Sequence, residues 1–167
     1  MEIREVRPDE YEAAGAVTAR AYHEFADFED PDWVEYLGEI ADVAGRVDRT
    51  VVLVAEEDGH ILGTATLELD QTIGDDDPQL PPDTASLRML GVDQEARGRG
   101  IGRALVDETL ARARAAGKTV MVLRTTEQMR TAQALYRSMG FEPDPDRDIV
   151  FDDGFRLIGY RLELERP

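Results

Sequence analysis

Apolar and polar residues recur with two different periods along the chain, and each change of period marks a new element. Alternating or β-branched apolar runs predict strands over residues 2–6, 50–56, 61–70, 85–92, 120–125, a strand from 141, and one containing 158–164. Apolar residues spaced three and four apart predict helices over residues 9–28, 31–45, 101–116 and 129–139. The predicted order is therefore a strand, two helices, three strands, a helix, a strand, a helix and two strands.

Turn and capping residues support several of these boundaries. Asp9 with Glu12 matches a capping box at the start of the first helix, and Pro31 is typical of the first turn of the second. Asp58-Gly59 between two β-rich runs predicts a tight hairpin, so the two flanking strands are expected to be antiparallel neighbours.

A long acidic segment separates the third and fourth predicted strands. Residues 71–83 contain Gly74, Pro78, Pro81 and Pro82, which predict a surface loop. Loops of this kind often contribute to binding sites, although a passive connection fits the same composition.

Composition limits the class of protein. A chain of 167 residues with 42% hydrophobic residues is expected to form one globular domain over residues 1–167. Its apolar runs are too short to span a membrane, and residues 1–5 lack a signal-peptide core, so we expect a cytoplasmic protein. With no cysteine and only His23 and His60, the sequence argues against disulfides, cysteine nucleophiles and bound metal.

The net charge of -17 restricts the partners. Nucleic acids and anionic membranes attract basic proteins, so neither is expected to bind here. A cationic small substrate would be favoured. The acidity has a second explanation that fits equally well, because it also maintains solubility and suits a salty cytosol.

A glycine-rich segment joins the strand over residues 85–92 to the following helix. In Arg97–Gly102, three glycines alternate with Arg97, Arg99 and Ile101. Glycines allow a tight turn that presents several N–H groups to one point, where the helix dipole also favours an anion. The segment therefore predicts a phosphate cradle, to which Arg97, Arg99 or Arg103 could add charge.

Glycine-rich segments before a helix have two other common interpretations. A dinucleotide-binding fingerprint would require Gly or Ala at Arg103 or at Leu105, depending on the register, and an acidic ribose ligand near residue 118, where the chain has Lys118. The sequence argues against that fold. An ordinary glycine turn that only caps a helix remains the simpler alternative.

Two spaced motifs resemble the GNAT superfamily of acyl-CoA-dependent N-acetyltransferases. Arg97, Gly100 and Gly102 match its glycine signature, and Leu123–Thr126 with Ala132–Phe141 is similar to its second motif. The resemblance implies an α/β (α+β) fold with a central mixed, mostly antiparallel sheet of about seven strands flanked by four helices. It also implies acetyl transfer from acetyl-CoA to a primary amine of a small molecule or peptide, by direct attack in a ternary complex. A homodimer is compatible with it.

The resemblance also implies roles for particular residues. Tyr136 would be the general acid that protonates the leaving CoA thiolate. Without the resemblance, its spacing with apolar neighbours is typical of a core tyrosine. The implied cofactor-binding residues, through strand-edge pairing and backbone N–H groups, are Leu90, Gly91, Val92, Arg97, Gly98, Arg99, Gly100, Ile101, Gly102 and Arg103.

The general base departs from the family pattern. The family often places a glutamate on the strand before the glycine loop, but residues 85–90 contain no carboxylate. Thr64, Thr66, Glu68 and Asp70 alternate onto one face of the preceding strand, so Glu68 could act through a water. A solvated polar face explains the same alternation. Met129 occupies the position where the family commonly has a cofactor-contacting asparagine.

Two other functions remain open from the sequence. The chain could be a non-catalytic CoA-binding or regulatory module, or it could use a longer acyl-CoA or a hydroxyl acceptor. The family's acceptor pocket would lie between the first two helices, the loop after Asp70 and the last hairpin. Five aromatic residues on the first two helices could line it or could simply belong to the core: Tyr22, Phe25, Phe28, Trp33 and Tyr36.

Overall fold

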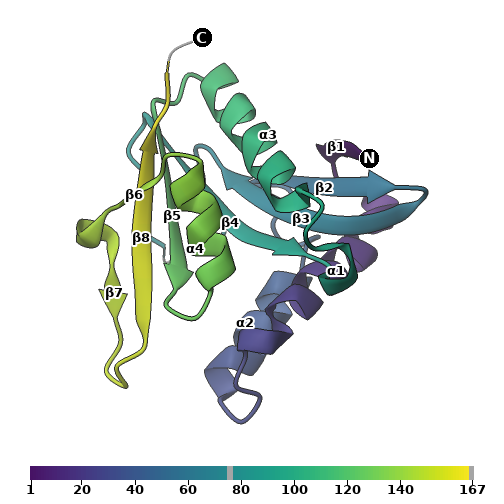
Figure 1. Cartoon of the computed structure of the whole chain (residues 1–167), viewed down its shortest axis with the longest axis horizontal. Helices are drawn as coiled ribbons and strands as arrows, with labels where there is room; N and C mark the ends of the chain where they lie inside the picture. Colours follow the sequence, from purple (N-terminus) through teal and green to yellow (C-terminus); the bar gives the residue numbers. More distant parts are fainter. Residues whose placement is uncertain (75–76, 166–167) are drawn as a thin grey trace.

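The computed structural model describes residues 1–74 and 77–165, which form a twisted sheet with helices on both faces (Figure 1). Its strands are β1 (Glu2–Glu5), β2 (Val51–Glu57), β3 (His60–Glu68), β4 (Thr84–Val92), β5 (Val120–Thr126), β6 (Glu142–Pro143), β7 (Ile149–Val150) and β8 (Arg156–Glu163). Its α-helices are α1 (Tyr11–Tyr22), α2 (Pro31–Ala41), α3 (Ile101–Ala115) and α4 (Arg130–Ser138).

The sheet has the order β1-β2-β3-β4-β5-β8-β6, with β7 paired to β8. All its pairs are antiparallel except β4 with β5. This confirms the predicted mixed, mostly antiparallel sheet with four helices. The short β7 raises the strand count to eight from the predicted seven or so. The hairpin between β2 and β3 turns at Asp58 and Gly59, both with positive φ, as the sequence predicts.

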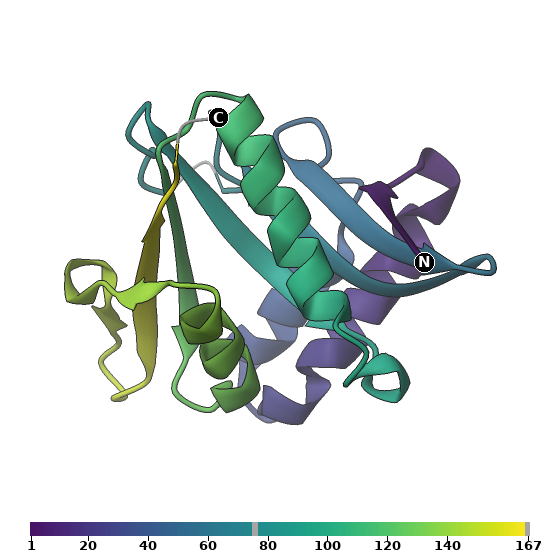
Figure 2. The same ribbon diagram turned by 45° about the horizontal axis from the view of Figure 1, so that its top comes forward.

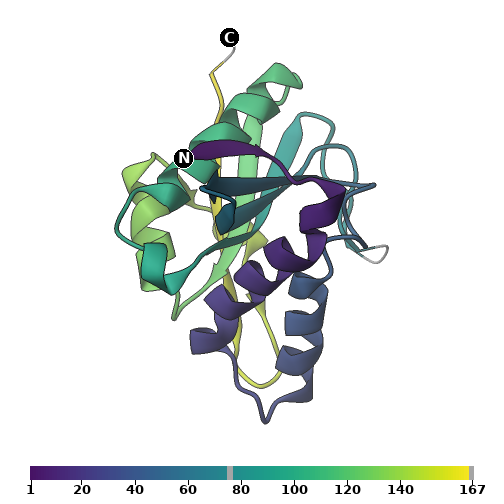
Figure 3. The same cartoon turned by 90° about the vertical axis from the view of Figure 1, so that its right-hand side faces the viewer.

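The helices divide between the two faces of the sheet. Apolar side chains of β2 such as Leu53 and Ala55 join the main core beneath α3 and α4, whereas Val52 and Val54 pack with Ala14 of α1. Figure 3 shows α1 and α2 on the side of the sheet opposite α3 and α4. Alternate side chains of β2 therefore pack into two different cores, one on each face of the sheet.

The start of the first helix differs from the prediction. A 3-10 turn over Pro8–Glu10 precedes α1, and Glu10 accepts a hydrogen bond from the backbone N–H of Arg7 at 2.9 Å. The capping box proposed for Asp9 and Glu12 is wrong, because the glutamate that bonds back to the chain is Glu10, two residues earlier, and Arg4 holds its carboxylate at 2.6 Å. The helices also end earlier than predicted, α1 at Tyr22 and α2 at Ala41.

The polar row on β3 is buried. Thr64, Thr66 and Glu68 are each at most 2% exposed, because α1 and the segment after α2 cover this face. The hydroxyl of Thr64 is hydrogen-bonded to Thr18 of α1, and that of Thr66 accepts a hydrogen bond from Nε of Arg46 at 3.3 Å. A solvated polar face is therefore the wrong interpretation for these three residues, whereas Asp70, beyond the end of β3, is exposed and pairs with Lys118 at 2.8 Å.

Strands β4 and β5 separate along their length (Figure 2). They pair only where Thr84–Ser86 meets Val120–Val122. Thr64 pairs with Gly91 and Thr66 with Arg88, so β4 contains one residue more than β3 over this stretch, and Met89 has a φ of 53°. This bulge turns β4 away from β5 and leaves its far edge without a strand partner.

No helix in the described residues is long and apolar enough to cross a membrane.

Candidate functional site

A cavity of about 740 Å³ opens where β4 and β5 separate. One wall consists of β4 and β5, including Leu90 and Leu123, and Tyr136 of α4 contributes from one side of the sheet. The opposite wall comes from α1, α2, the loop after β3 and the hairpin before β8. The cavity therefore reaches both faces of the sheet, so two different molecules could enter it from opposite sides.

The glycine-rich segment forms an open turn at the N-terminus of α3. Gly98 and Gly100 have φ values of 81° and 79°, which favour glycine, and a Cβ on either would meet nothing within 4 Å. Gly100 is the N-cap and supplies no side chain to the helix. The first N–H groups of α3, on Ile101, Gly102 and Arg103, therefore lack helical partners and present positive charge to an open space.

The arginines of this segment are engaged elsewhere. Arg97 forms an ion pair with Glu24 at 2.5 Å, and Arg99 forms one with Glu57 at 2.7 Å, where it lowers the pKa of Glu57. Arg103 donates a hydrogen bond to the hydroxyl of Ser138 at 2.7 Å. The anion affinity of the turn thus arises first from its backbone N–H groups and the helix dipole.

The edge of β4 continues from this turn into the cavity. Gly91 and Val92 pair with β3 on one side, whereas the side facing β5 is unpaired beyond Ser86. An extended molecule could bind to this edge as an added strand. A Cβ on Gly91 would lie 3.0 Å from that of Ala21, so this glycine allows α1 to approach the strand closely.

Tyr136 is buried on α4, with 6% of its surface exposed. Its ring lies 5.6 Å from that of Phe141 and 6.3 Å from that of Tyr160. Its hydroxyl has no hydrogen-bond partner in residues 1–74 and 77–165, although it lies in the wall of the cavity. Burial raises the pKa of Tyr136 well above its usual value, so the phenol retains its proton at neutral pH.

Glu68 lies in the opposite part of the wall. One of its carboxylate oxygens accepts a hydrogen bond from the N–H of Ile73 at 2.6 Å and lies 3.6 Å from Nη1 of Arg88. The same nitrogen of Arg88 donates to Asp77 at 2.9 Å. Arg88 thus links β4 to β3 and to the loop after it. Sequence reasoning noted the loop but not this arginine.

Aromatic residues line the same side of the cavity. The ring of Trp33 lies 6.0 Å from Tyr36 and 6.3 Å from Phe155, so it joins α2 to the hairpin before β8. Tyr22, Trp33 and Tyr36 line the cavity, as one reading of the sequence proposed. Phe25 is not part of this wall, and Phe28 is 59% exposed.

The structure thus brings together Tyr136, Glu68 and Leu90, which line one cavity. Gly98–Arg103 lie outside it, at the start of α3, and are connected to it through the edge of β4. Met129 also lines the cavity, and its sulfur accepts a hydrogen bond from Thr125 at 3.5 Å. Sequence reasoning missed Arg147, which reaches the cavity from the turn after β6, because no motif marks that segment.

Curated relatives match part of the chain. Human N-acetyltransferase 8B is 38% identical over 89 residues, which are 53% of this chain and 37% of that protein. A mycothiol acetyltransferase from Sanguibacter keddieii is 33% identical over 147 residues, which are 84% of this chain and 43% of that protein. The chain spans about two fifths of the length of these relatives.

Solved structures match nearly the whole chain. The protein yncA from Salmonella typhimurium, solved with its cofactor acetyl-CoA, is 26% identical with a TM-score of 0.69, over 100% of this chain and 95% of that one. A ribosomal-protein-alanine N-acetyltransferase from Brucella melitensis is 24% identical with a TM-score of 0.70, over 98% and 100%. The model of the acetyltransferase (GNAT) family matches residues 6–141, so the chain belongs to this family.

Proposed function

We propose that the chain transfers an acetyl group from acetyl-CoA to a primary amine of a small molecule or peptide. The observation that carries the proposal is the cavity between β4 and β5, which is lined both by Tyr136 and by residues of the unpaired edge of β4 such as Leu90. Family membership and the acetyl-CoA bound to yncA support the choice of cofactor.

The residues present fit this cofactor. The open turn at Gly98 and Gly100 leaves room for a pyrophosphate, which the N–H groups of Ile101–Arg103 would hold. The edge of β4 at Leu90–Val92 would pair with the pantetheine amides. When bound, acetyl-CoA supplies an acetyl group activated as a thioester.

The chain's own groups would then manage the protons. Glu68, through a water, would take a proton from the incoming amine, since an amine with a pKa of about 10 arrives mostly charged. Backbone N–H groups near the bulge at Met89 would stabilise the negative charge on the carbonyl oxygen. As the carbon–sulfur bond breaks, Tyr136 would donate its proton to the thiolate. The absence of cysteine supports direct attack by the amine, without a cysteine acyl-enzyme.

Release of free thiol from acetyl-CoA across a panel of amines tests this proposal, with the acetylated amine identified by mass spectrometry. We expect thiol release that depends on the amine, with matching product. Calorimetric binding of CoA without turnover of any amine would contradict it.

That contradictory outcome would favour a non-catalytic CoA-binding module. Longer acyl-CoAs and alcohols in the same assay distinguish the remaining alternatives.

A further inference from the structure

Two arginines in the wall of the cavity lack a carboxylate partner. Neither Arg124 nor Arg147 forms an ion pair with any carboxylate in the described part of the chain. The chain contains 36 acidic residues and only 19 Lys and Arg, so a basic side chain has many available partners. Arg88, in the same cavity, contacts both Glu68 and Asp77. Arg46 and Arg103 also form no ion pair with a carboxylate in the described residues, but Arg124 and Arg147 differ from them because they line the cavity, where an anion could reach them.

The fold holds these arginines side by side. Gly159 of β8 lies opposite Arg124 of β5, and a Cβ on Gly159 would lie 2.7 Å from that of Arg147. This glycine thus lets the turn after β6 lie against the sheet. Nε of Arg124 then donates a hydrogen bond to the carbonyl of Arg147 at 2.7 Å. Burial and the neighbouring Arg124 lower the pKa of Arg147, and the carboxylates of Asp144 and Glu68 offset this only in part. Nε of Arg147 is buried without a partner. A bound anion would favour the charged form of Arg147 and would give its Nε a hydrogen-bond partner.

The arginines belong to the acceptor side of the cavity. Arg124 alternates along β5 with Leu123, which packs in the main core with Tyr136 of α4. Because successive side chains of a strand point to opposite faces, Arg124 points to the face on which α1 and α2 lie. A group bound to it would therefore enter the cavity from the face opposite α4.

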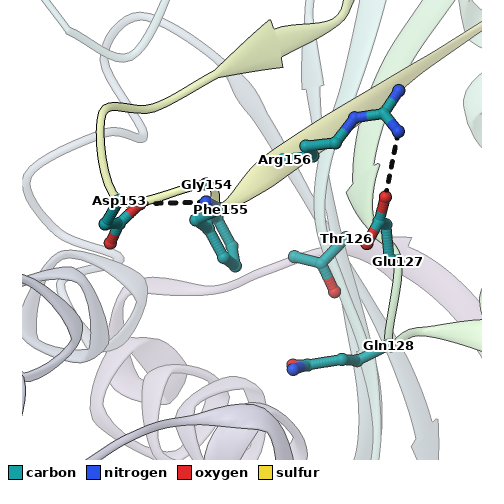
Figure 4. Close-up of a pocket in the computed structure, with 7 residues that line it drawn as sticks. All are labelled: Thr126, Glu127, Gln128, Asp153, Gly154, Phe155 and Arg156. Atoms are coloured by element: carbon teal, nitrogen blue, oxygen red, sulfur yellow. Dashed lines mark hydrogen bonds and ion pairs between the residues drawn. The ribbon is translucent and has the colours of Figure 1, made fainter.

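A third unpartnered group lies on the same face. Thr126 is two residues further along β5, about 7 Å from Arg124 at the spacing of a strand. It is only 5% exposed, and its hydroxyl has no hydrogen-bond partner. Thr126 also lines a smaller hollow of about 350 Å³ that shares Asp153 and Phe155 with the main cavity. Figure 4 shows Thr126 between Phe155 and the Glu127–Arg156 ion pair.

We propose that Arg124, Arg147 and Thr126 bind a carboxylate of the acceptor, which is therefore a primary amine that also carries a carboxylate, as an amino acid does. This inference rests on the proposed function. The planar guanidinium matches a carboxylate in shape and charge, and a hydroxyl can donate to the same group. Six acidic residues also line the cavity, among them Asp32 and Asp152, so an ammonium group is favoured and an acceptor with several negative charges is disfavoured. The substrate favoured by these charges is a zwitterion.

Calorimetry on the CoA-saturated protein tests the site without requiring turnover. The probes are matched pairs: phenylalanine with phenethylamine, 4-aminobutanoate with propylamine, and O-phosphoethanolamine with ethanolamine. We expect at least one carboxylated probe to bind about tenfold or more tightly than its partner, because charge-assisted hydrogen bonds are made to the carboxylate. Equal binding within both carboxylated pairs, or a preference for the phosphate alone, would overturn the proposal.

Three variants test which residues cause the tighter binding of the carboxylated probes. Arg124→Gln and Arg147→Gln should reduce it to about twofold or less, and Thr126→Val should weaken it while preserving the shape of the side chain. Arg161→Gln is the matched control, because Arg161 is an exposed arginine on the adjacent strand β8 that does not line the cavity. A preference that persists in both arginine variants would overturn the site. Melting temperatures identify any variant that fails to fold, and exposed Arg124 is the safest position to replace.

Thiol release with the same probes separates this inference from the proposed function. Carboxylate-dependent binding without acetylation of any probe would contradict the enzyme but leave the carboxylate site in place. Acetylation of both members of each pair at equal kcat/KM would support the enzyme and overturn the carboxylate site.

Discussion

Oε2 of Glu68 lies 3.6 Å from Nη1 of Arg88, across the pairing of β3 with β4, and accepts the N–H of Ile73 at 2.6 Å. Both partners present N–H groups to the same carboxylate oxygen. They also fix its position in the cavity wall. The proposed base is therefore held in place before any acceptor binds.

Replacing Glu68 with Gln should slow acetyl transfer about a hundredfold or more at neutral pH. The substitution keeps an oxygen for the N–H of Ile73 and the shape of the side chain, and it removes the basic group together with the negative charge that faces Arg88. The rate should recover as the pH rises toward about 10, because the free amine then no longer needs a base. The measurement is kcat/KM between pH 6 and 10.

A matched control is Thr66→Val, two residues away in the same buried row and outside the cavity. Its pH profile should parallel that of the unmodified protein. A loss in Glu68→Gln that is constant at every pH would show that Glu68 has a structural role and would contradict its role as a base.

Gly100→Asp should abolish CoA binding while the fold remains. A side chain at Gly100 has open space, so the local cost is that of a positive φ, about 1–2 kcal/mol. A carboxylate there would repel a pyrophosphate at the start of α3. Gly117→Asp is the control, because Gly117 has a φ of 81° and open space at the other end of the same helix. Equal CoA affinity of the two variants, measured by calorimetry, would refute the cradle.

Most of the fold follows from local sequence patterns. The periods of two and 3.6 predict the strands and helices because each burial face repeats with its own element, and Asp58-Gly59 predicts the hairpin from the positive φ values that its turn requires. The glycine turn at Gly98 and Gly100 is predictable for the same reason. These signals depend on residues close together in the chain.

The remaining features depend on contacts distant in sequence. Arg46 is 2% exposed although arginine usually lies at the surface, because carbonyls of α2 and a hydroxyl of β3 surround it. The burial of Thr64 depends on α1 in the same way. Arg147 reaches the cavity only because Gly159 lets its turn lie against the sheet. No local pattern indicates such arrangements.

Arg46→Leu should lower the free energy of unfolding by about 2–4 kcal/mol. The guanidinium donates to the carbonyls of Glu39 at 2.9 Å and Asp42 at 3.1 Å, at the end of α2, and to the hydroxyl of Thr66. Leucine would remove all three hydrogen bonds, and although the carbonyl of Glu39 would still accept the N–H of Asp42, the carbonyl of Asp42 and the hydroxyl of Thr66 would lose their donor. Adding Thr66→Val should recover part of the loss by removing one orphaned group, as urea denaturation would measure. Full stability of the single variant would contradict this account.

The Arg4–Glu10 pair should make stability depend on pH in acid. Hydrogen bonds from Arg4 at 2.6 and 2.8 Å lower the pKa of Glu10 from 4.5 to about 2. Because the folded-state pKa is the lower one, the stabilisation is complete above pH 4.5 and disappears as the pH falls toward 2. Glu10→Gln should therefore be less stable than the unmodified protein at pH 6, and the difference should shrink by pH 2 to 3. A difference that does not change with pH would contradict the assignment.

Tyr136→Phe should lower activity and leave stability nearly unchanged, whereas Tyr160→Phe should lower stability and leave activity unchanged. The hydroxyl of Tyr136 has no partner in the described residues, so its loss should barely change stability but should lower kcat about a hundredfold or more if it protonates the thiolate. Tyr160 is 1% exposed and donates to Gln133 at 3.2 Å, so its variant should lose about 1 kcal/mol of stability and keep its kcat. Thiol-release kinetics and urea denaturation of both variants give the comparison. A normal kcat in Tyr136→Phe, with CoA affinity unchanged, would remove Tyr136 from the proposed chemistry.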